Sequence, residues 1–126
     1  MSAKRIVAID DEPHILRILE LKLRNAGYDV VTAINGRDGV EKIAATSPDI
    51  VISDVNMPEM GGLELLTAIQ ELRGERDFLV IMLTAQTEAE VRAFIDTIPN
   101  TELMSKPFSP RKILERVDAW FTRAAA

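Results

Sequence analysis

Short apolar runs alternate along the chain with segments in which apolar residues recur at helical spacing. The runs predict strands at residues 5–9, 29–33, 49–53, 78–83 and 101–104, and the helical segments lie at 13–25, 36–46, 62–73, 87–97 and 109–123. The strand candidates are short and rich in β-branched residues, which is typical of buried parallel strands. Strict alternation of strands and helices predicts an α/β fold with helices on both faces of a parallel sheet.

The first predicted helix has signals at both ends. Pro13 suits the first turn, where a missing N–H costs little, and Gly27 can end the helix in a left-handed conformation. Between them, four apolar residues repeat at helical spacing: Ile15, Ile18, Leu19 and Leu23. This spacing predicts a helix.

Capping signals also mark the last two helices. Thr87 followed by Glu90 forms a candidate capping box, and Ser109-Pro110 is a cap-then-proline start. The last helix carries an apolar stripe made of Ile113, Leu114, Val117, Trp120 and Phe121. We interpret this stripe, Trp120 included, as core packing.

Acidic side chains stand where two of the predicted strands end. Asp10 and Asp11 directly follow the first strand, and Asp54 follows the third. Because ligands bind at the carboxyl edge of open α/β sheets, these carboxylates should meet in one site. Carboxylates gathered there would repel one another without a cation, and oxygen ligands suit Mg²⁺. The sequence therefore predicts a magnesium site, and magnesium sites usually handle phosphate.

Further polar positions fall at the same edge. Asn56 lies just beyond the third strand, and Thr84 ends the fourth strand with Ala85 beside it. Lys106-Pro107 follows the fifth strand, and the X-Pro bond there can be cis. Each alone has an ordinary explanation, as a helix cap, a turn residue or a solvated charge. Their joint occurrence, each at a strand end, favours a single site.

Composition limits the class of protein. The 126 residues suffice for one domain with a real core but not for two. The net charge of −5 argues against nonspecific binding to nucleic acid or anionic membranes, and the absence of cysteine excludes disulfides and thiolate chemistry. No apolar run is long enough for a membrane span or a signal peptide, so we expect a cytoplasmic protein.

Together these pieces resemble the CheY-like receiver domain of two-component response regulators. The matching motifs are Asp10-Asp11-Glu12-Pro13, Ser53-Asp54-Val55-Asn56-Met57-Pro58 with Gly62, Thr84-Ala85 and Lys106-Pro107-Phe108. The resemblance covers residues 1–126 and implies one receiver domain with a flavodoxin-like fold. That fold is a doubly wound sheet of five parallel strands, order 2-1-3-4-5, with five helices and a switch point between strands 1 and 3.

The resemblance implies a role for each acidic residue. Asp54 is expected to be the phosphoacceptor, a carboxylate nucleophile that becomes an acyl phosphate. Asp10, Asp11, Asp54 and the backbone carbonyl of Asn56 are expected to bind Mg²⁺, Asp11 directly and Asp10 through water. This assignment agrees with the chemistry, because phosphoryl transfer needs positioning and charge neutralisation more than covalent help from the protein.

The other motif residues are expected to bind and read the phosphoryl group. Lys106 would pair with one of its oxygens, Thr84 would hydrogen-bond another, and Ala85 would leave room for it. Leu103 and Pro107 belong to the same switch region by the resemblance.

The chain also departs from the usual receiver pattern. Leu103 stands three residues before the lysine, where receivers usually carry Tyr or Phe, so the usual aromatic rotamer switch is absent. Pro99 breaks a helix and should reshape the connection into the last strand. Gln86 and Asn56 border the route of the hydrolytic water in the family, so they are expected to influence the lifetime of the phosphorylated form.

The resemblance implies a signalling module rather than an enzyme with separate substrates. The phosphoryl donor would be a histidine kinase or a histidine phosphotransfer protein. A downstream effector protein or domain would bind a surface formed by residues 87–97, 101–104 and 109–123, and homodimerisation through that surface stays open. Direct contact with nucleic acid or membrane is not expected.

Other functions compete with this one. A magnesium-dependent phosphatase or phosphotransferase acting on small molecules would use similar groups, but the chain has no cap insertion and no Asp-x-Asp pair after the first strand. A receiver used only for docking would not need the intact set Asp10, Asp11, Asp54, Thr84 and Lys106. A flavodoxin phosphate loop and a P-loop are both absent. His14, the only histidine, is interpreted as a surface residue.

Overall fold

The predicted α/β fold is confirmed in the computed structural model, which describes residues 4–55, 57, 60–74, 78–84 and 89–123. These residues form a five-stranded sheet in the order β2-β1-β3-β4-β5, and every neighbouring pair is parallel. The strands are β1 (Arg5–Ile9), β2 (Asp29–Ala33), β3 (Ile50–Asp54), β4 (Leu79–Thr84) and β5 (Thr101–Ser105). The strand order reverses between β1 and β3, as the resemblance implied.

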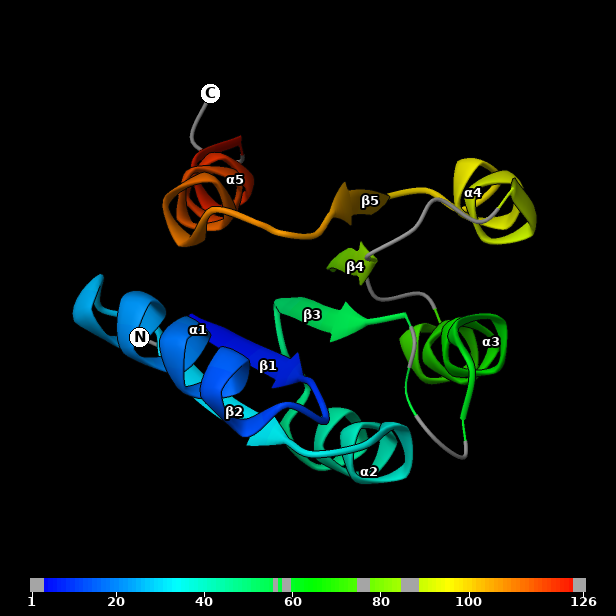
Figure 1. Cartoon of the computed structure of the whole chain (residues 1–126), viewed down its shortest axis with the longest axis horizontal. Coiled ribbons are helices and arrows are strands. Elements are labelled where there is room, and N and C mark those ends of the chain that lie inside the picture. Colours follow the sequence, from blue (N-terminus) through cyan, green and yellow to red (C-terminus); the bar gives the residue numbers. More distant parts are fainter. Residues whose placement is uncertain (1–3, 56, 58–59, 75–77, 85–88, 124–126) are drawn as a thin grey trace.

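Five helices within the described residues cover the sheet in two layers. They are α1 (Pro13–Asn25), α2 (Gly36–Thr46), α3 (Gly62–Arg73), α4 (Ala89–Asp96) and α5 (Pro110–Arg123). Helices α1 and α5 lie on one face of the sheet, and α2, α3 and α4 lie on the other (Figure 1). No helix in this described part is long and apolar enough to cross a membrane.

Alternating strand residues supply the two halves of the core. In β1, Ile6 and Ala8 pack into the cluster that also contains Trp120 of α5, whereas Val7 and Ile9 pack into the cluster on the opposite face. Period-two alternation sends successive side chains to opposite faces of a sheet, and both faces are buried here. Trp120 is 5% exposed, so its predicted role in core packing is confirmed.

Helix α1 buries only part of its apolar stripe. Its buried face is formed by Leu16, Leu19 and Leu23, whereas Ile18 is 47% exposed. The helix carries apolar residues on two faces, and only the Leu16 face packs on the sheet.

The ends of several elements follow local signals. Gly27, just beyond α1, has a φ of +96°, and Lys112 N donates to Ser109 Oγ at 3.4 Å at the start of α5. Strand β3 is shifted by one residue from its predicted range, because Asp54 pairs with Leu83 as its last residue. The capping box at Thr87 lies outside the described residues.

Helix α2 lies very close to the sheet at one glycine. A Cβ atom on Gly39 would stand 2.4 Å from Cδ1 and 2.9 Å from Cγ1 of Ile9, which is 1% exposed. Gly39→Ala should therefore lower the free energy of unfolding by about 1–3 kcal/mol, the usual cost of overpacking a core. Urea denaturation would measure this loss. Gly61→Ala is the matched control, because Gly61 has a φ of −73° and, apart from its chain neighbours, no atom of the described residues lies within 4 Å of the added Cβ. An equal loss in both variants would contradict the explanation.

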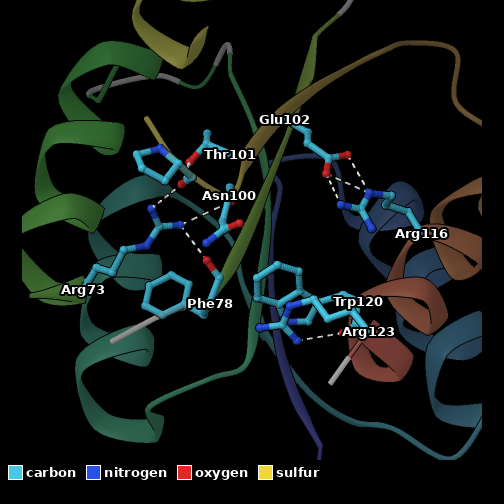
Figure 2. A network of polar contacts seen from close by, with 9 residues as sticks. Arg73, Phe78, Asn100, Thr101, Glu102, Arg116, Trp120 and Arg123 are labelled. Carbon is cyan, nitrogen blue, oxygen red and sulfur yellow. Dashed lines mark hydrogen bonds and ion pairs between the residues drawn. The ribbon is translucent and has the colours of Figure 1, made fainter. Parts of the chain in front are cut away.

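The buried side chain of Arg73 forms hydrogen bonds with the connection between α4 and β5. Arg73, at the end of α3, donates from Nη1 to Pro99 O at 3.0 Å and from Nη2 to Phe78 O at 2.7 Å and Asn100 O at 3.4 Å (Figure 2). Its guanidinium also lies over the Phe78 ring, 4.7 Å from the centroid. Pro99 and Asn100 are thus held against the start of β4, where Asn100 has a φ of +55°.

Helix α5 is tied to the edge strand by a second polar contact. Arg116 Nε donates to both carboxylate oxygens of Glu102 at 2.7 Å (Figure 2). Arg116 Nη2 also donates to Glu102 Oε2, so two N–H groups of the planar guanidinium meet the carboxylate, an arrangement that is stronger and more specific than a single ion pair. Further along α5, the Arg123 guanidinium covers the Trp120 ring at 3.3 Å from its centroid.

Candidate functional site

Buried polar side chains gather where the strands β1, β3 and β4 end. Asp10 directly follows β1, Asp54 is the last residue of β3, and Thr84 is the last residue of β4. Their exposed fractions are 1%, 4% and 2%. Carboxylates are rarely buried to this degree without a charged partner, so this arrangement marks a functional site rather than ordinary surface.

The partner of both carboxylates is Lys106, which follows β5. Its ammonium nitrogen lies 3.4 Å from Asp10 Oδ2 and 3.4 Å from Asp54 Oδ1, and its side chain is 12% exposed. The backbone also fixes the lysine, since Lys106 N donates to Thr84 O at 2.6 Å. The site thus joins two buried carboxylates to one ammonium, while the end of β4 binds the backbone of Lys106.

The Lys106 ammonium partly compensates the buried negative charges of Asp10 and Asp54. Burial raises the pKa of Asp10 above its ordinary value of 3.8, and the nearby Asp54 carboxylate raises it further. The backbone N–H of Glu12 and the Lys106 ammonium lower the pKa of Asp10, but they do not cancel the rise. Burial alone would lower the pKa of Lys106, but the carboxylates of Asp10 and Asp54 outweigh it and raise that pKa. Lys106 therefore stays charged at neutral pH, whereas burial disfavours the ionised form of Asp10.

An acidic cluster opens from the buried site to the surface. One carboxylate oxygen each from Asp10, Asp11 and Glu12 lies within 4.8 Å of the others, and only Asp10 is buried. Glu12 N donates to Asp10 Oδ1 at 2.9 Å, which orients the buried carboxylate. No role was assigned to Glu12 from the sequence, although this residue belongs to the acidic motif. Its position as the third of three consecutive acidic residues could have indicated that it joins the cluster.

The structure places the other predicted site residues as follows. Leu103 is half-buried, pairs with Met82 of β4 and packs on the cluster that faces α2–α4. Pro107 is exposed, and the Lys106–Pro107 peptide bond is cis.

Asn56, Ala85 and Gln86 lie outside the described residues, so their predicted roles stay predictions. His14 is exposed, as predicted, and its Nε2 lies 3.7 Å from Glu12 Oε2.

The donor set suits a hard divalent cation. Carboxylate oxygens at the mouth of the site are ligands that Mg²⁺ prefers, and Lys106 now supplies the positive charge between two of the carboxylates. An ammonium and a hydroxyl beside a carboxylate can bind the oxygens of a transferred phosphoryl group.

Comparison with known proteins agrees with this geometry. The family model for the response regulator receiver domain matches residues 6–118. The chain is a response regulator receiver domain. Such receiver domains are signalling modules of two-component systems, and this receiver has the five-stranded order and the acidic edge described above.

Individual relatives agree with the family assignment. The receiver is 34% identical over 122 residues to the alkaline phosphatase synthesis transcriptional regulatory protein PhoP of Bacillus subtilis (strain 168), covering 96% of this chain and 50% of PhoP. It thus spans about half the length of that curated relative.

Solved structures are also similar. The chemotaxis protein CheY4 of Vibrio cholerae matches with a TM-score of 0.83 and 31% identity, covering 94% of this chain and 98% of CheY4. A CheY-like receiver domain protein from Methanospirillum hungatei JF-1 matches with a TM-score of 0.83 and 29% identity, covering 94% and 93% of the two chains.

Proposed function

We propose that this receiver takes a phosphoryl group onto Asp54 from a phosphohistidine of a histidine kinase or a histidine phosphotransfer protein. One observation carries the proposal: the Lys106 ammonium lies 3.4 Å from the buried carboxylates of both Asp10 and Asp54, at the sheet edge where Thr84 ends β4. A carboxylate that can act as a nucleophile is thereby held against a cation, at the edge of the sheet where the strand of Thr84 also ends.

In the proposed reaction, a carboxylate oxygen of Asp54 attacks the phosphorus atom of the phosphohistidine. The P–N bond breaks, the electron pair returns to the imidazole, and an acyl phosphate forms on Asp54. Lys106 then pairs with an oxygen of the phosphoryl group and Thr84 donates a hydrogen bond to another. The transition state carries its charge on the equatorial oxygens, so the fixed ammonium lowers the barrier without covalent participation.

Asp10, Asp11 and Asp54, with the carbonyl of Asn56, would hold Mg²⁺. When bound, the ion neutralises the phosphoryl oxygens and the carboxylates that face them. Asp10 is oriented for this by the hydrogen bond from Glu12 N. The carboxylates of Asp10 and Asp54 already bind one positive charge, the ammonium of Lys106.

Phosphorylation would then act as a switch. It adds a charge of about −1.5 to −2 and three strong acceptors, and it takes Lys106 away from its present carboxylate partners. Moving a two-state equilibrium from 1:99 to 99:1 needs about 5.5 kcal/mol, which a few charge-assisted hydrogen bonds of about 1.5–3 kcal/mol each supply. The responding surface is α4, β5 and α5, which would bind an effector protein or domain or a second receiver. Leu103 would repack there in place of an aromatic ring.

Intact-mass spectrometry tests the proposal. Incubation with acetyl phosphate and Mg²⁺ should add one phosphoryl group to the protein, and Asp54→Asn should add none because the nucleophile is gone. Omission of Mg²⁺ should suppress the gain as well. An equal mass gain in Asp54→Asn would exclude Asp54 as the acceptor, and no gain under any condition would reject the reaction.

A further inference from the structure

The connection between β2 and α2 contacts both loops that carry the proposed Mg²⁺ ligands. On one side, Asp10 N donates to Ala33 O at 3.1 Å, so the residue that follows β1 is bonded to the end of β2. On the other side, Gly36 lies against Met60, which comes shortly before α3. A Cβ atom on Gly36 would stand 2.8 Å from Met60 Sδ and 2.9 Å from Met60 Cβ. Residues 33–36 thus touch the loops after β1 and β3, although none of them was predicted to belong to the site.

Space, and not backbone conformation, requires the glycine at position 36. Gly36 is buried and begins α2, and its φ does not lie in the left-handed region. Any other residue would bring its own Cβ to 2.9 Å from the Cβ of Met60, which is closer than Cβ contacts in real structures. A rotation of the Met60 side chain can move Sδ away, but it cannot move Cβ, which is fixed to the backbone. The bare backbone at Gly36 therefore sets where the backbone of Met60 can lie.

The start of α2 is a fixed reference for this contact. Asn35 Oδ1 accepts a hydrogen bond from Asp38 N at 2.8 Å, and Asp38 Oδ2 accepts one from Ile34 N at 3.3 Å. These reciprocal bonds satisfy backbone N–H groups on both sides of the helix start. Gly39, within the first turn of α2, packs on Ile9 in the core. Because α2 is held by its own cap and by the core, the loop that lies against it is the part that must adjust to a change at their contact.

The segment between β3 and α3 is attached to the core at its described residues. Val55 and Met57 are buried in the cluster that faces α2–α4, and Met60 packs against the same cluster. Asn56, whose carbonyl is a proposed Mg²⁺ ligand, stands between Val55 and Met57 in the sequence. The contact of Met60 with Gly36 thus fixes the far end of a segment that carries a proposed metal ligand.

We propose that Gly36 and Met60 are positioning residues for the Mg²⁺ site, a role that rests on the proposed function. Neither residue is a candidate ligand, and both act through the backbone. Their contact sets the position of the segment that carries Asn56 relative to the connection to which Asp10 is bonded. Mg²⁺ demands nearly ideal octahedral geometry, so its ligands have to keep their spacing. A small displacement of one loop therefore weakens metal binding more than it weakens the fold.

Gly36→Ala tests the contact in the full chain. Titration calorimetry with MgCl₂, at a temperature where the variant is fully folded, should show an affinity about tenfold lower, the effect expected when groups that orient metal ligands are disturbed. Phosphorylation by acetyl phosphate should need about tenfold more Mg²⁺ for its half-maximal rate. The rate at saturating Mg²⁺ should change little, because Asp54 and Lys106 are unaltered. An unchanged affinity for Mg²⁺ in the folded variant would overturn the proposal.

Gly39→Ala is the matched control for overpacking of the same helix. The three atoms nearest to its added Cβ are Cδ1, Cγ1 and Cγ2 of Ile9, which belong to a side chain that can move without its backbone. This variant should lose stability, as expected above, and yet bind Mg²⁺ within about twofold of the unaltered chain. An equal loss of Mg²⁺ affinity in Gly39→Ala and Gly36→Ala would show that Gly36 acts only through the stability of the fold, and the positioning role would fail.

A second variant keeps the test decisive if Gly36→Ala does not fold. Met60→Ala cannot overpack, and it removes the side chain that holds the segment against Gly36 and the core, so Mg²⁺ affinity should fall several-fold. Met104→Ala is its control, because Met104 is also partly buried but packs on the cluster at the other face of the sheet. An equal loss in both methionine variants would overturn the proposal. Normal Mg²⁺ binding in Met60→Ala rejects the positioning role alone, whereas an unaltered chain that neither binds Mg²⁺ nor gains a phosphoryl group rejects the proposed function as well.

Discussion

Asp10→Asn is expected to make the metal-free protein more stable while removing its response to Mg²⁺. The Asp10 side chain is 0% exposed, and burial raises its pKa above 3.8, so the ionised carboxylate destabilises the folded state at neutral pH. A neutral amide of the same shape avoids this cost, and Lys106 keeps Asp54 as a partner. A gain of about 1 kcal/mol would raise the Tm by roughly 3–6 °C for a domain of this size.

The pH dependence follows from the direction of the pKa shift. A carboxyl group whose pKa is higher in the folded than in the unfolded state contributes stability below its unfolded pKa and loses that contribution as pH rises through the folded pKa. The stability advantage of Asp10→Asn should therefore be absent at low pH, appear as pH rises past 3.8 and level off above the raised pKa. Thermal unfolding across this pH range checks the trend.

Two controls separate this explanation from a general charge effect. Asp96→Asn, on the exposed end of α4, removes the same charge outside the site. It should leave the rise in Tm on addition of Mg²⁺ intact, whereas Asp10→Asn should lose most of it. A lower Tm for Asp10→Asn in the absence of metal would show that the ion pair with Lys106 outweighs desolvation, contrary to the expectation.

Much of the fold could be predicted because each element has a local cause. The ranges 13–25, 36–46 and 62–73 coincide with α1, α2 and α3, since prolines, glycines and caps mark their ends. The exposure of Ile18 could not be predicted, because spacing alone does not distinguish two apolar faces of one helix. Only the packing of α1 on the sheet shows which of them is buried.

The site was predictable as a set of residues but not as a geometry. Parallel strands bring their carboxyl ends to one edge, which was enough to group Asp10, Asp54, Thr84 and Lys106. Strands β3 and β4 separate β1 from β5 in the sheet, however, and sequence spacing does not reveal that the Lys106 side chain reaches across them to Asp10. Nor does it reveal which carboxylates are desolvated, and desolvation is what sets the pKa of Asp10.

Lys106→Met is expected to increase the affinity for Mg²⁺. The ammonium lies 3.4 Å from carboxylate oxygens of both Asp10 and Asp54, so a cation that binds there must compete with a positive charge already in place. Methionine keeps an unbranched apolar stem but carries no charge. At the effective dielectric of a partly buried site, removing one such charge should tighten Mg²⁺ binding by about tenfold or more. Titration calorimetry with MgCl₂ measures the affinity.

The same variant should separate metal binding from the switch. Because Lys106 is the proposed partner of a phosphoryl oxygen, Lys106→Met should bind Mg²⁺ tightly and yet lose most of its affinity for beryllofluoride, which mimics the phosphoryl group. Lys112→Met, on the exposed side of α5, removes the same charge and should change neither property. Weaker Mg²⁺ binding in Lys106→Met than in Lys112→Met would show that the lysine organises the carboxylates for the metal instead of competing with it.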